Sequence, residues 1–481
     1  MPESFFSSED VPPTVMDVRR YFENEQASFH MPGHKQRGGF HPLAPTVLGG
    51  PALRNDVSEM GGFDYLHSPE SSLVDAQQRS AHIFGARRTF FLVNGSTVGN
   101  LAAILSQVAD GDHVLALRGS HRSVYSAIGL AGASPRYVPM IFDRENHGWF
   151  VAAPPPLRLD IIPRLIHVTR PNYYGMAVDL APYRRLADAT DAVLVVDEAH
   201  GTHFGADPRL PESALHQGAD IVVQSTHKTL SALTQSSMLH VGEDPQGRVN
   251  VAALGQTLSM LQSSSPSALL TMSLDLAAHE HARNNFAATR RVVDLAIDTR
   301  NRLNAKLRTV QLFEAPDIQN DPTKLVFDLQ HLAMSGFDAR SWLLKEGIGV
   351  ELADHRRIVC SLTVGDDEAT AQLLIDSVVA LDTTRHRGSL VLAPPELAEP
   401  VVAMRPREAL HRKSEVVATD DATDRICSEY VIPYPPGIPL IAPGERVTTN
   451  VLDALQSFRN AEARIVGPAS PTVETLLVVA E

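Results

Sequence analysis

The sequence predicts an α/β protein, with a large domain built on a mostly parallel sheet and smaller α/β domains after it. Short apolar runs alternate with helical stretches between about residues 89 and 240, which is typical of βαβ units. Several of these runs end in turns rich in glycine, serine or charged residues, and such turns form the ligand-binding edge of an α/β sheet. A length of 481 residues, 43% of them apolar, suits two or three packed domains.

The individual elements follow from this pattern in chain order. The expected strands of the large domain are 89–93, 114–117, 165–169, 192–196 and 221–223. The stretch from about Ser267 to Leu307 contains no glycine or proline, so it is predicted as one long helix that links two domains. Lys324 to Leu329 is predicted as a strand of the second domain.

Proline-rich segments divide the second half of the chain. Prolines near residues 390–400 mark a linker, and the turn 434–439 contains too many prolines to be helical. The expected parts are an N-terminal arm (1–28), a large domain (29–290), a small α/β domain (291–388) and a C-terminal domain (389–481).

Composition excludes several classes of protein. The chain has 42 Lys and Arg against 56 Asp and Glu, a net charge of −14, which argues against nucleic acid as the main partner. Its two cysteines, Cys360 and Cys427, are too few for a disulfide framework, and a reducing cytoplasm is the expected location. Neither an export signal nor a membrane span is expected. No metal site is expected either, because Pro32 and Gly33 interrupt the spacing of His30 and His34.

Two charged residues carry the chemistry. Asp197 follows the apolar run 192–196, and Lys228 follows the run 221–223, so both should lie at the same edge of the sheet. A lysine amine can hold a carbonyl cofactor as a Schiff base, and a carboxylate can keep a pyridine nitrogen protonated. The pair therefore predicts pyridoxal phosphate (PLP) chemistry, with a structural salt bridge as the alternative for Asp197.

Two turns before these strands offer further ligands for such a cofactor. Ser96 and Thr97 follow a strand and open a helix, where hydroxyls and backbone N–H groups suit a phosphate, or form an ordinary helix cap. His121 occupies the equivalent turn one βα unit later. Its imidazole can lie flat on a cofactor ring, and an ordinary surface histidine is the alternative.

An ordered series of motifs then resembles a known family, the ornithine/lysine/arginine decarboxylases of the PLP-dependent aminotransferase-like fold (fold type I). The resemblance covers nearly the whole chain and fits the short form, which lacks an N-terminal wing domain. The Asp-Glu-Ala-His motif also distinguishes the chain from long forms with Asp-Ser-Ala-Trp. The motifs are Phe29–Lys35, Asp56–Glu59, Leu66–Pro69, Phe91–Thr97, Asp197–Gly201, Gln224–Thr229, Leu261–Ser267 and Pro433–Pro439.

The resemblance implies a role for each site residue. Lys228 would form the Schiff base and Asp197 would pair with the pyridine nitrogen, while His121 and Ala199 would lie on the two faces of the ring. The active site would lie between two chains of a homodimer or larger oligomer. The remaining cofactor contacts are expected from Ser96, Thr97, His200, Ser225 and His227, and from Ser264 or an adjacent serine of a neighbouring subunit.

The reaction implied is decarboxylation of a basic amino acid, with arginine ranked before lysine and ornithine. The products would be carbon dioxide and agmatine, cadaverine or putrescine. Glu429 would face the cationic end of the substrate, unless it is a surface acid beside Arg425. The proton donor to the α-carbon is left open between Lys228 and a histidine. Two alternatives remain: another PLP reaction on a cationic amino acid, such as transamination or oxidative deamination, and a non-catalytic homologue.

Overall fold

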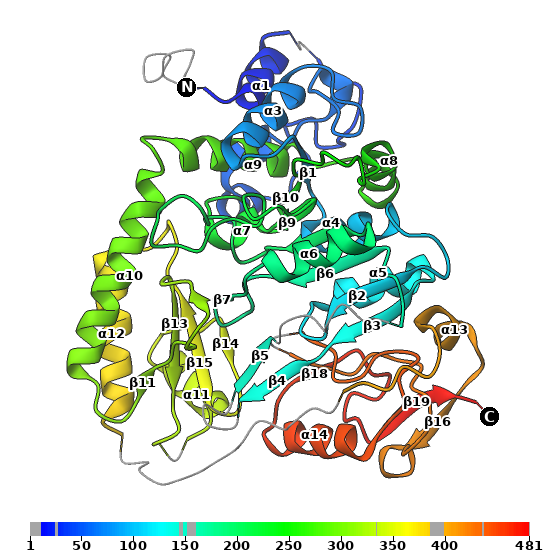
Figure 1. Cartoon of the computed structure of the whole chain (residues 1–481). Coiled ribbons are helices and arrows are strands. Elements are labelled where there is room, and N and C mark those ends of the chain that lie inside the picture. The colour runs from blue at the N-terminus through cyan, green and yellow to red at the C-terminus, as the bar shows by residue number, and fades with distance from the viewer. Residues whose placement is uncertain are drawn as a thin grey trace.

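A seven-stranded sheet forms the centre of the molecule, in the order β1-β10-β9-β8-β6-β2-β3 (Figure 1). The computed structural model describes residues 11–24, 27–143, 148–151, 160–332, 334–384, 399–434 and 437–480. Strands β9, β8, β6, β2 and β3 pair in parallel, and β10 is antiparallel to both β1 and β9, so the predicted mostly parallel sheet is confirmed. The strands are β1 Arg88–Leu92, β2 His113–Leu117, β3 Ser134–Val138, β6 Leu165–Thr169, β8 Val193–Asp197, β9 Ile221–Gln224 and β10 Ser237–Val241.

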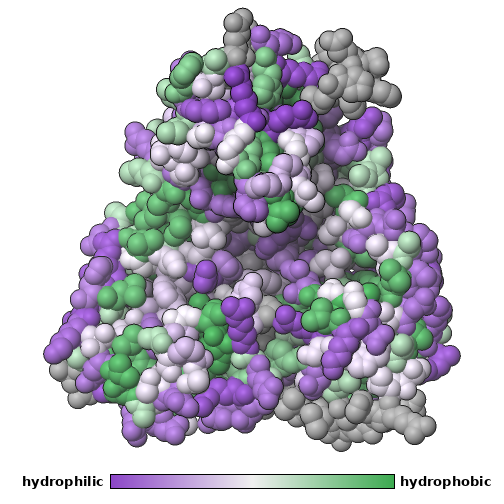
Figure 2. Space-filling view, turned by 180° about the vertical axis from the view of Figure 1, so that it is seen from behind, coloured by the Kyte–Doolittle hydropathy of each residue, from purple (hydrophilic) through white to green (hydrophobic). Residues whose placement is uncertain are grey.

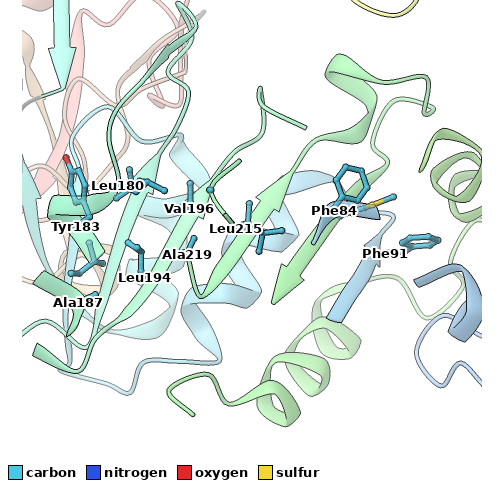
Figure 3. Close-up of a cluster of buried hydrophobic side chains, with 14 of the residues drawn as sticks. Phe84, Phe91, Leu180, Tyr183, Ala187, Leu194, Val196, Leu215 and Ala219 are labelled. Atoms are coloured by element: carbon cyan, nitrogen blue, oxygen red, sulfur yellow. The ribbon is translucent and has the colours of Figure 1, made fainter. Parts of the chain in front are cut away.

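Helices pack against both faces of this sheet. Successive side chains of a strand point to opposite faces. In β8, Leu194 and Val196 therefore join the apolar cluster of Figure 3, which contains Tyr183 of a covering helix. Val193 and Val195 pack on the other face, among side chains of α4 and α5. The helices around the sheet are α3 Ser72–Phe84, α4 Gly95–Leu105, α5 Arg122–Ala131, α6 Ala181–Thr190, α8 Val251–Leu261 and α9 Ala268–Ala282.

The expectation of one helix from Ser267 to Leu307 is wrong, because the chain forms two helices there. Helix α9 ends at Ala282 and α10 runs from Ala287 to Lys306. Between them, Asn284, Asn285 and Phe286 adopt positive φ angles of 50°, 56° and 61°. Asparagine tolerates this left-handed conformation better than most residues, so the Asn-Asn pair allows the chain to turn.

The small domain has its own sheet and its own core. Its four-stranded sheet has the order β11-β13-β15-β14. Side chains of α10, α11 and α12 complete an apolar cluster with this sheet. A separate two-stranded ladder joins the small domain to the large one, because Gln319 and Asn320 of β12 pair with Ala177 and Met176 of β7. The elements are β7 Met176–Ala177, β11 Gln311–Leu312, β12 Gln319–Asn320, β13 Lys324–Asp328, α11 Gly336–Lys345, β14 Leu352–Ala353, β15 Arg357–Ser361 and α12 Glu368–Asp382.

The C-terminal segment forms a further unit beside the large domain (Figure 1). A buried ion pair joins the two, since both nitrogens of the Arg118 fork contact the Glu445 carboxylate, at 2.5 and 2.9 Å. The predicted linker falls largely on residues 385–398, outside the described part of the chain, as do two prolines of the turn 434–439. The elements are α13 Pro406–His411, β16 Ser414–Ala418, β17 Ile432–Pro433, α14 Thr449–Asn460, β18 Ile465–Val466 and β19 Thr475–Val479.

Helix α10 runs through the domain boundary expected at residue 290, and the three expected boundaries between the four parts stay predictions. Seen from behind, the molecule has a mainly hydrophilic hollow near its middle (Figure 2). Across the residues that can be described, no helix is both long and apolar enough to cross a bilayer. The remaining elements include α1 Pro13–Asn24, α2 Gly50–Arg54, β4 Met140–Asp143, β5 Gly148–Val151 and α7 Thr226–Thr229.

Candidate active site

A cavity of about 400 Å³ lies at the C-terminal edge of the large sheet. The ends of β8 and β9 and the turns that open α4 and α5 form much of its wall, as expected for a ligand site in an α/β sheet. Tyr434 of the C-terminal segment and Tyr173 also line it. The cavity brings together the predicted site residues Ser96, Thr97, His121, Asp197, Ala199, His200, Ser225, His227 and Lys228.

Asp197 presents a buried carboxylate to this cavity. It is 3% exposed, and its oxygens accept hydrogen bonds from Nδ2 of Asn100 at 2.8 Å and from the backbone N–H of Ala199 at 3.1 Å. Within the described ranges, no cationic side chain lies within ion-pair distance of it, so the alternative of a structural salt bridge finds no support. A buried carboxylate is costly without a cationic partner, and a protonated pyridine nitrogen fits this position.

His121 is held by hydrogen bonds at the start of α5. Its Nδ1 accepts from the backbone N–H of Ser123 at 3.2 Å and lies 2.9 Å from the Ser123 hydroxyl. That hydroxyl also accepts from Nδ2 of Asn100 at 3.0 Å, so one amide connects His121 with Asp197. Burial lowers the pKa of His121, with Asp197 opposing the shift and Lys228 adding to it. A neutral ring in a fixed orientation suits contact with the face of an aromatic cofactor.

Hydroxyl groups gather at the N-terminus of α4. The Ser96 hydroxyl lies 2.7 Å from that of Ser225 and 3.2 Å from that of Ser237. Gly95 begins the helix with a φ of 74°, which glycine adopts without strain. The N–H groups of a first helical turn have no partner within the helix, and with the hydroxyls they form a suitable phosphate site.

Lys228 lies on the single helical turn α7 and points its amine at a histidine. Its Nζ is 3.0 Å from Nε2 of His200. Burial lowers the pKa of the Lys228 amine; Asp197 and Glu351 oppose the shift, and Lys324 adds to it. An unprotonated amine is the reactive form towards a carbonyl group, so the surroundings favour the nucleophile.

Several site residues were missed by the sequence analysis. Asn100 had a recognisable signal, because it lies four positions after Ser96 on the same side of a helix. Lys324 had a weaker one, as a lysine at the start of an apolar strand. Tyr173, whose ring meets that of His200 edge to face at 5.4 Å, and Glu351 had none, because only the tertiary fold places them here.

Two predicted residues do not line the cavity of this chain. Ser264 is exposed, in the loop after α8, where its carbonyl accepts from the Tyr65 hydroxyl at 3.2 Å. Glu429 is 7% exposed, and its two oxygens accept from the backbone N–H groups of Ala469 and Leu477, both at 2.7 Å. Glu429 is therefore bound by backbone in the C-terminal segment, and its expected contact with substrate stays a prediction.

Solved structures define the class of this fold. A lysine decarboxylase from Francisella novicida matches with a TM-score of 0.85 at 20% identity, over 98% of this chain and 81% of that one. Lysine decarboxylase A from Pseudomonas aeruginosa matches with a TM-score of 0.80 at 22% identity, over 98% and 81%. A serine palmitoyltransferase from Sphingomonas wittichii gives 0.51 at 13% identity, over 77% and 83%. The protein has fold type I, as the resemblance implied.

Sequence relatives define the family. Residues 12–328 match the model of the Orn/Lys/Arg decarboxylase major domain, and residues 395–470 match that of its C-terminal domain. An arginine decarboxylase from Halalkalibacterium halodurans is 33% identical over 99% of both chains, and one from Bacillus subtilis is 32% identical over 98% of both. The chain belongs to the Orn/Lys/Arg decarboxylase family. It is a decarboxylase, which confirms the predicted class of reaction.

Proposed function

We propose that this protein is a PLP-dependent decarboxylase that acts on L-arginine and releases agmatine and carbon dioxide. The single observation that carries the cofactor is the joint presence of the Lys228 amine and the buried Asp197 carboxylate in one cavity. Arginine is favoured over lysine and ornithine because near full-length relatives at 32–33% identity are named arginine decarboxylase.

The cofactor's parts correspond to separate walls of the cavity. In this proposal Lys228 would hold the aldehyde carbon and Asp197 would keep a proton on the ring nitrogen, while His121 and Ala199 would contact the ring faces. Bound PLP supplies an electron sink for the bond that breaks when carbon dioxide leaves. The phosphate group is assigned to Ser96, Thr97, Ser225 and His227, at the α4 N-terminus and the β9 end.

The chain's own groups then control protons in the site. Asp197 can stay ionised because Asn100 and the Ala199 N–H group hydrogen-bond its oxygens. Return of a proton to the substrate α-carbon is assigned to Lys228 or to His200, whose Nε2 is 3.0 Å from the lysine amine. His200 is buried and Lys228 is half-buried, so bulk water has limited access to these two groups.

A homodimer or larger oligomer with shared active sites is part of the proposal. The serine loop that contains Ser264 is exposed and does not line the cavity of its own chain, which leaves the Ser264 hydroxyl available to a neighbouring subunit. Large apolar side chains in the N-terminal segment, including Phe29 at 94% and Val47 at 74% exposure, are also available for burial between chains. Glu429 is retained as a candidate partner for the guanidinium group, within such an oligomer.

We propose a cytoplasmic location because the cysteines are unpaired. Cys360 and Cys427 are both free and buried. Burial raises the pKa of each thiol to about 12, so neither is poised for thiolate chemistry. Unpaired cysteines of this kind suit a reducing compartment.

The deciding experiment supplies PLP and one amino acid at a time. The purified protein is incubated with L-arginine, L-lysine or L-ornithine, and carbon dioxide and amine are followed by mass spectrometry. Agmatine with an equal amount of carbon dioxide is the expected result from arginine. Cadaverine or putrescine in its place would reassign the substrate, and no carbon dioxide from any of the three would overturn the proposal. Lys228→Ala is the matched negative control.

A further inference from the structure

A second lysine lies directly behind the histidine that contacts Lys228. Lys324 is the first residue of β13, in the small domain, and its Nζ lies 3.3 Å from Nδ1 of His200. The other ring nitrogen of His200 is 3.0 Å from Nζ of Lys228. One imidazole of the large domain thus lies between two amines, one from each domain.

The small domain holds Lys324 firmly in this position. Its Nζ donates to the hydroxyl of Ser361 at 2.6 Å, and the register of β13 and β15 sets these two residues directly opposite each other. Lys324 is 3% exposed and His200 is 6% exposed, so water competes little for these hydrogen bonds. Such an amine cannot turn away from the imidazole without losing its partners.

Hydrogen-bond chemistry then decides which nitrogen of His200 carries the hydrogen. A lysine ammonium can only donate, so Nδ1 must accept, and a neutral imidazole then carries its hydrogen on Nε2. His200 is neutral, because burial lowers its pKa well below the usual value and the charge of Lys324 adds to that shift. The Nε2–H group therefore faces Lys228.

We propose that Lys324 is a positioning residue for Lys228: by donating to Nδ1 of His200 it keeps the hydrogen on Nε2, and so offers Lys228 a donor that only a neutral amine can accept. This inference rests on the proposed cofactor role of Lys228. In this proposal the small domain, through Lys324, helps to keep the Lys228 amine unprotonated, together with the groups of the cavity wall.

Burial and nearby charges act on both lysines. Burial and the charge of Lys324 lower the pKa of Lys228, whereas Asp197 and Glu351 raise it. The net effect is a lowered pKa. Burial also lowers the pKa of Lys324, but Asp321 and Glu351 oppose that shift. The net direction is therefore the same for both lysines, and what marks Lys324 as the donor is geometry: its Nζ has the Ser361 hydroxyl and Nδ1 of His200 as acceptors, at 2.6 and 3.3 Å.

The test measures how readily the amine reacts, without any turnover. Protein stripped of cofactor is mixed with PLP at a series of pH values, and the rate of appearance of the yellow band that borohydride removes is recorded. In that reaction the lysine nitrogen bonds the carbonyl carbon, and the oxygen leaves as water with two hydrogens of the amine. Only the neutral amine reacts, so the rate rises through a pH midpoint that reports its protonation.

Lys324→Met keeps the length of the side chain but removes its charge and its donors. We expect its midpoint to move up by about one pH unit, which slows the reaction roughly tenfold at pH 7. Lys324→Arg keeps a charged donor and should stay close to the parent. Lys345→Met, at an exposed lysine of α11, is the matched control and should leave the midpoint unchanged.

Failure of this inference can be told apart from failure of the proposed function. If the parent protein forms no borohydride-sensitive band, the cofactor role of Lys228 falls, and this inference falls with it. If the parent forms the band and Lys324→Met has the parent's midpoint, only the role of Lys324 is overturned. Should Lys324→Met not fold, as judged by circular dichroism, Lys324→Leu, which also lacks charge and donors, takes its place with the same expected direction.

Discussion

Asn100 donates a hydrogen bond from Nδ2 to Oδ2 of Asp197 over 2.8 Å, and the same Nδ2 also donates to the hydroxyl of Ser123, which contacts His121. One buried amide, 1% exposed, thus sets the orientation of the carboxylate below the cavity and of the imidazole beside it. Loss of one such buried hydrogen-bond partner costs about 1 to 3 kcal/mol.

Replacement of Asn100 should therefore lower turnover more than cofactor binding. For Asn100→Ala we expect kcat to fall about ten- to a hundredfold, with a much smaller change in affinity for PLP. Steady-state kinetics with a cofactor titration would check this. Asn301→Ala, on an exposed face of α10, is the control. A normal kcat in Asn100→Ala would show that Asp197 needs no such support.

Removal of the Lys228 amine should abolish both colour and activity. Lys228→Ala is expected to lack the visible band in the presence of PLP and to lose turnover by about a thousandfold or more, because no other amine occupies its position. Absorption spectra with and without borohydride, together with carbon dioxide release, measure both effects. Substantial turnover in this variant would take lysine out of the mechanism.

Substrate recognition can be assigned by comparing two acids. Glu429→Gln is expected to raise KM for arginine about tenfold, as loss of a charged hydrogen-bond partner does. Glu351→Gln is the comparison, because Glu351 is close enough to raise the pKa of Lys228. An increase of KM in Glu351→Gln alone would move recognition to that residue. Glu474→Gln, at an exposed position, should leave KM unchanged.

The contact between Arg118 and Glu445 should be important for stability. Both side chains are nearly buried, and Glu445 also accepts the N–H group of Ala442 at 3.0 Å. Arg118→Met would leave a buried carboxylate without its cation, so we expect a loss of about 3 kcal/mol in the free energy of unfolding. Glu280→Gln, which breaks the exposed pair with Arg283, should cost less than about 1 kcal/mol. Denaturant titrations of both variants measure these costs.

Acid should destabilise the protein partly through His240. Burial lowers the pKa of His240 to about 3, while the Thr89 hydroxyl and Oε1 of Gln224 hold its neutral ring at 2.8 and 3.1 Å. The unfolded chain binds a proton near the ordinary value of 6.5, so this contribution is complete above pH 6.5 and is lost as pH falls towards 3. His240→Gln should flatten the decline between pH 6 and 4 by up to about 1.4 kcal/mol per pH unit, whereas exposed His331→Gln should not.

The sequence was a good guide wherever local pattern decides structure. The runs of β-branched residues at 165–169 and 192–196 became adjacent parallel strands, and Asp197 came to the edge where such strands end. Strand β10 was not predicted as an antiparallel strand, because its pairing with β1 depends on residues about 150 positions away. The expected single helix at 267–307 is wrong because the Asn-Asn pair allows left-handed backbone conformations that interrupt a helix, and the absence of glycine and proline does not reveal this.

The site residues also fall into those that a local sequence pattern predicts and those that it does not. Residues at turns after strands, such as Ser96 and Lys228, were found because the strand edge predicts where they lie. Lys324 and Glu351 come from the other domain, and no local pattern places them near His200 or Lys228. For Glu429 the sequence motif predicts a contact with substrate, but in the structure both carboxylate oxygens accept hydrogen bonds from backbone N–H groups.

The ladder between β7 and β12 limits how the two domains can behave. Because Met176 and Ala177 share backbone pairing with Asn320 and Gln319, the small domain cannot swing outward about a hinge without breaking main-chain hydrogen bonds. Lys324 lies only four positions after Asn320, the last residue of that ladder. Heating should consequently melt the large and small domains as a single cooperative unit, and the histidine between the two lysines should keep its partners until that global transition.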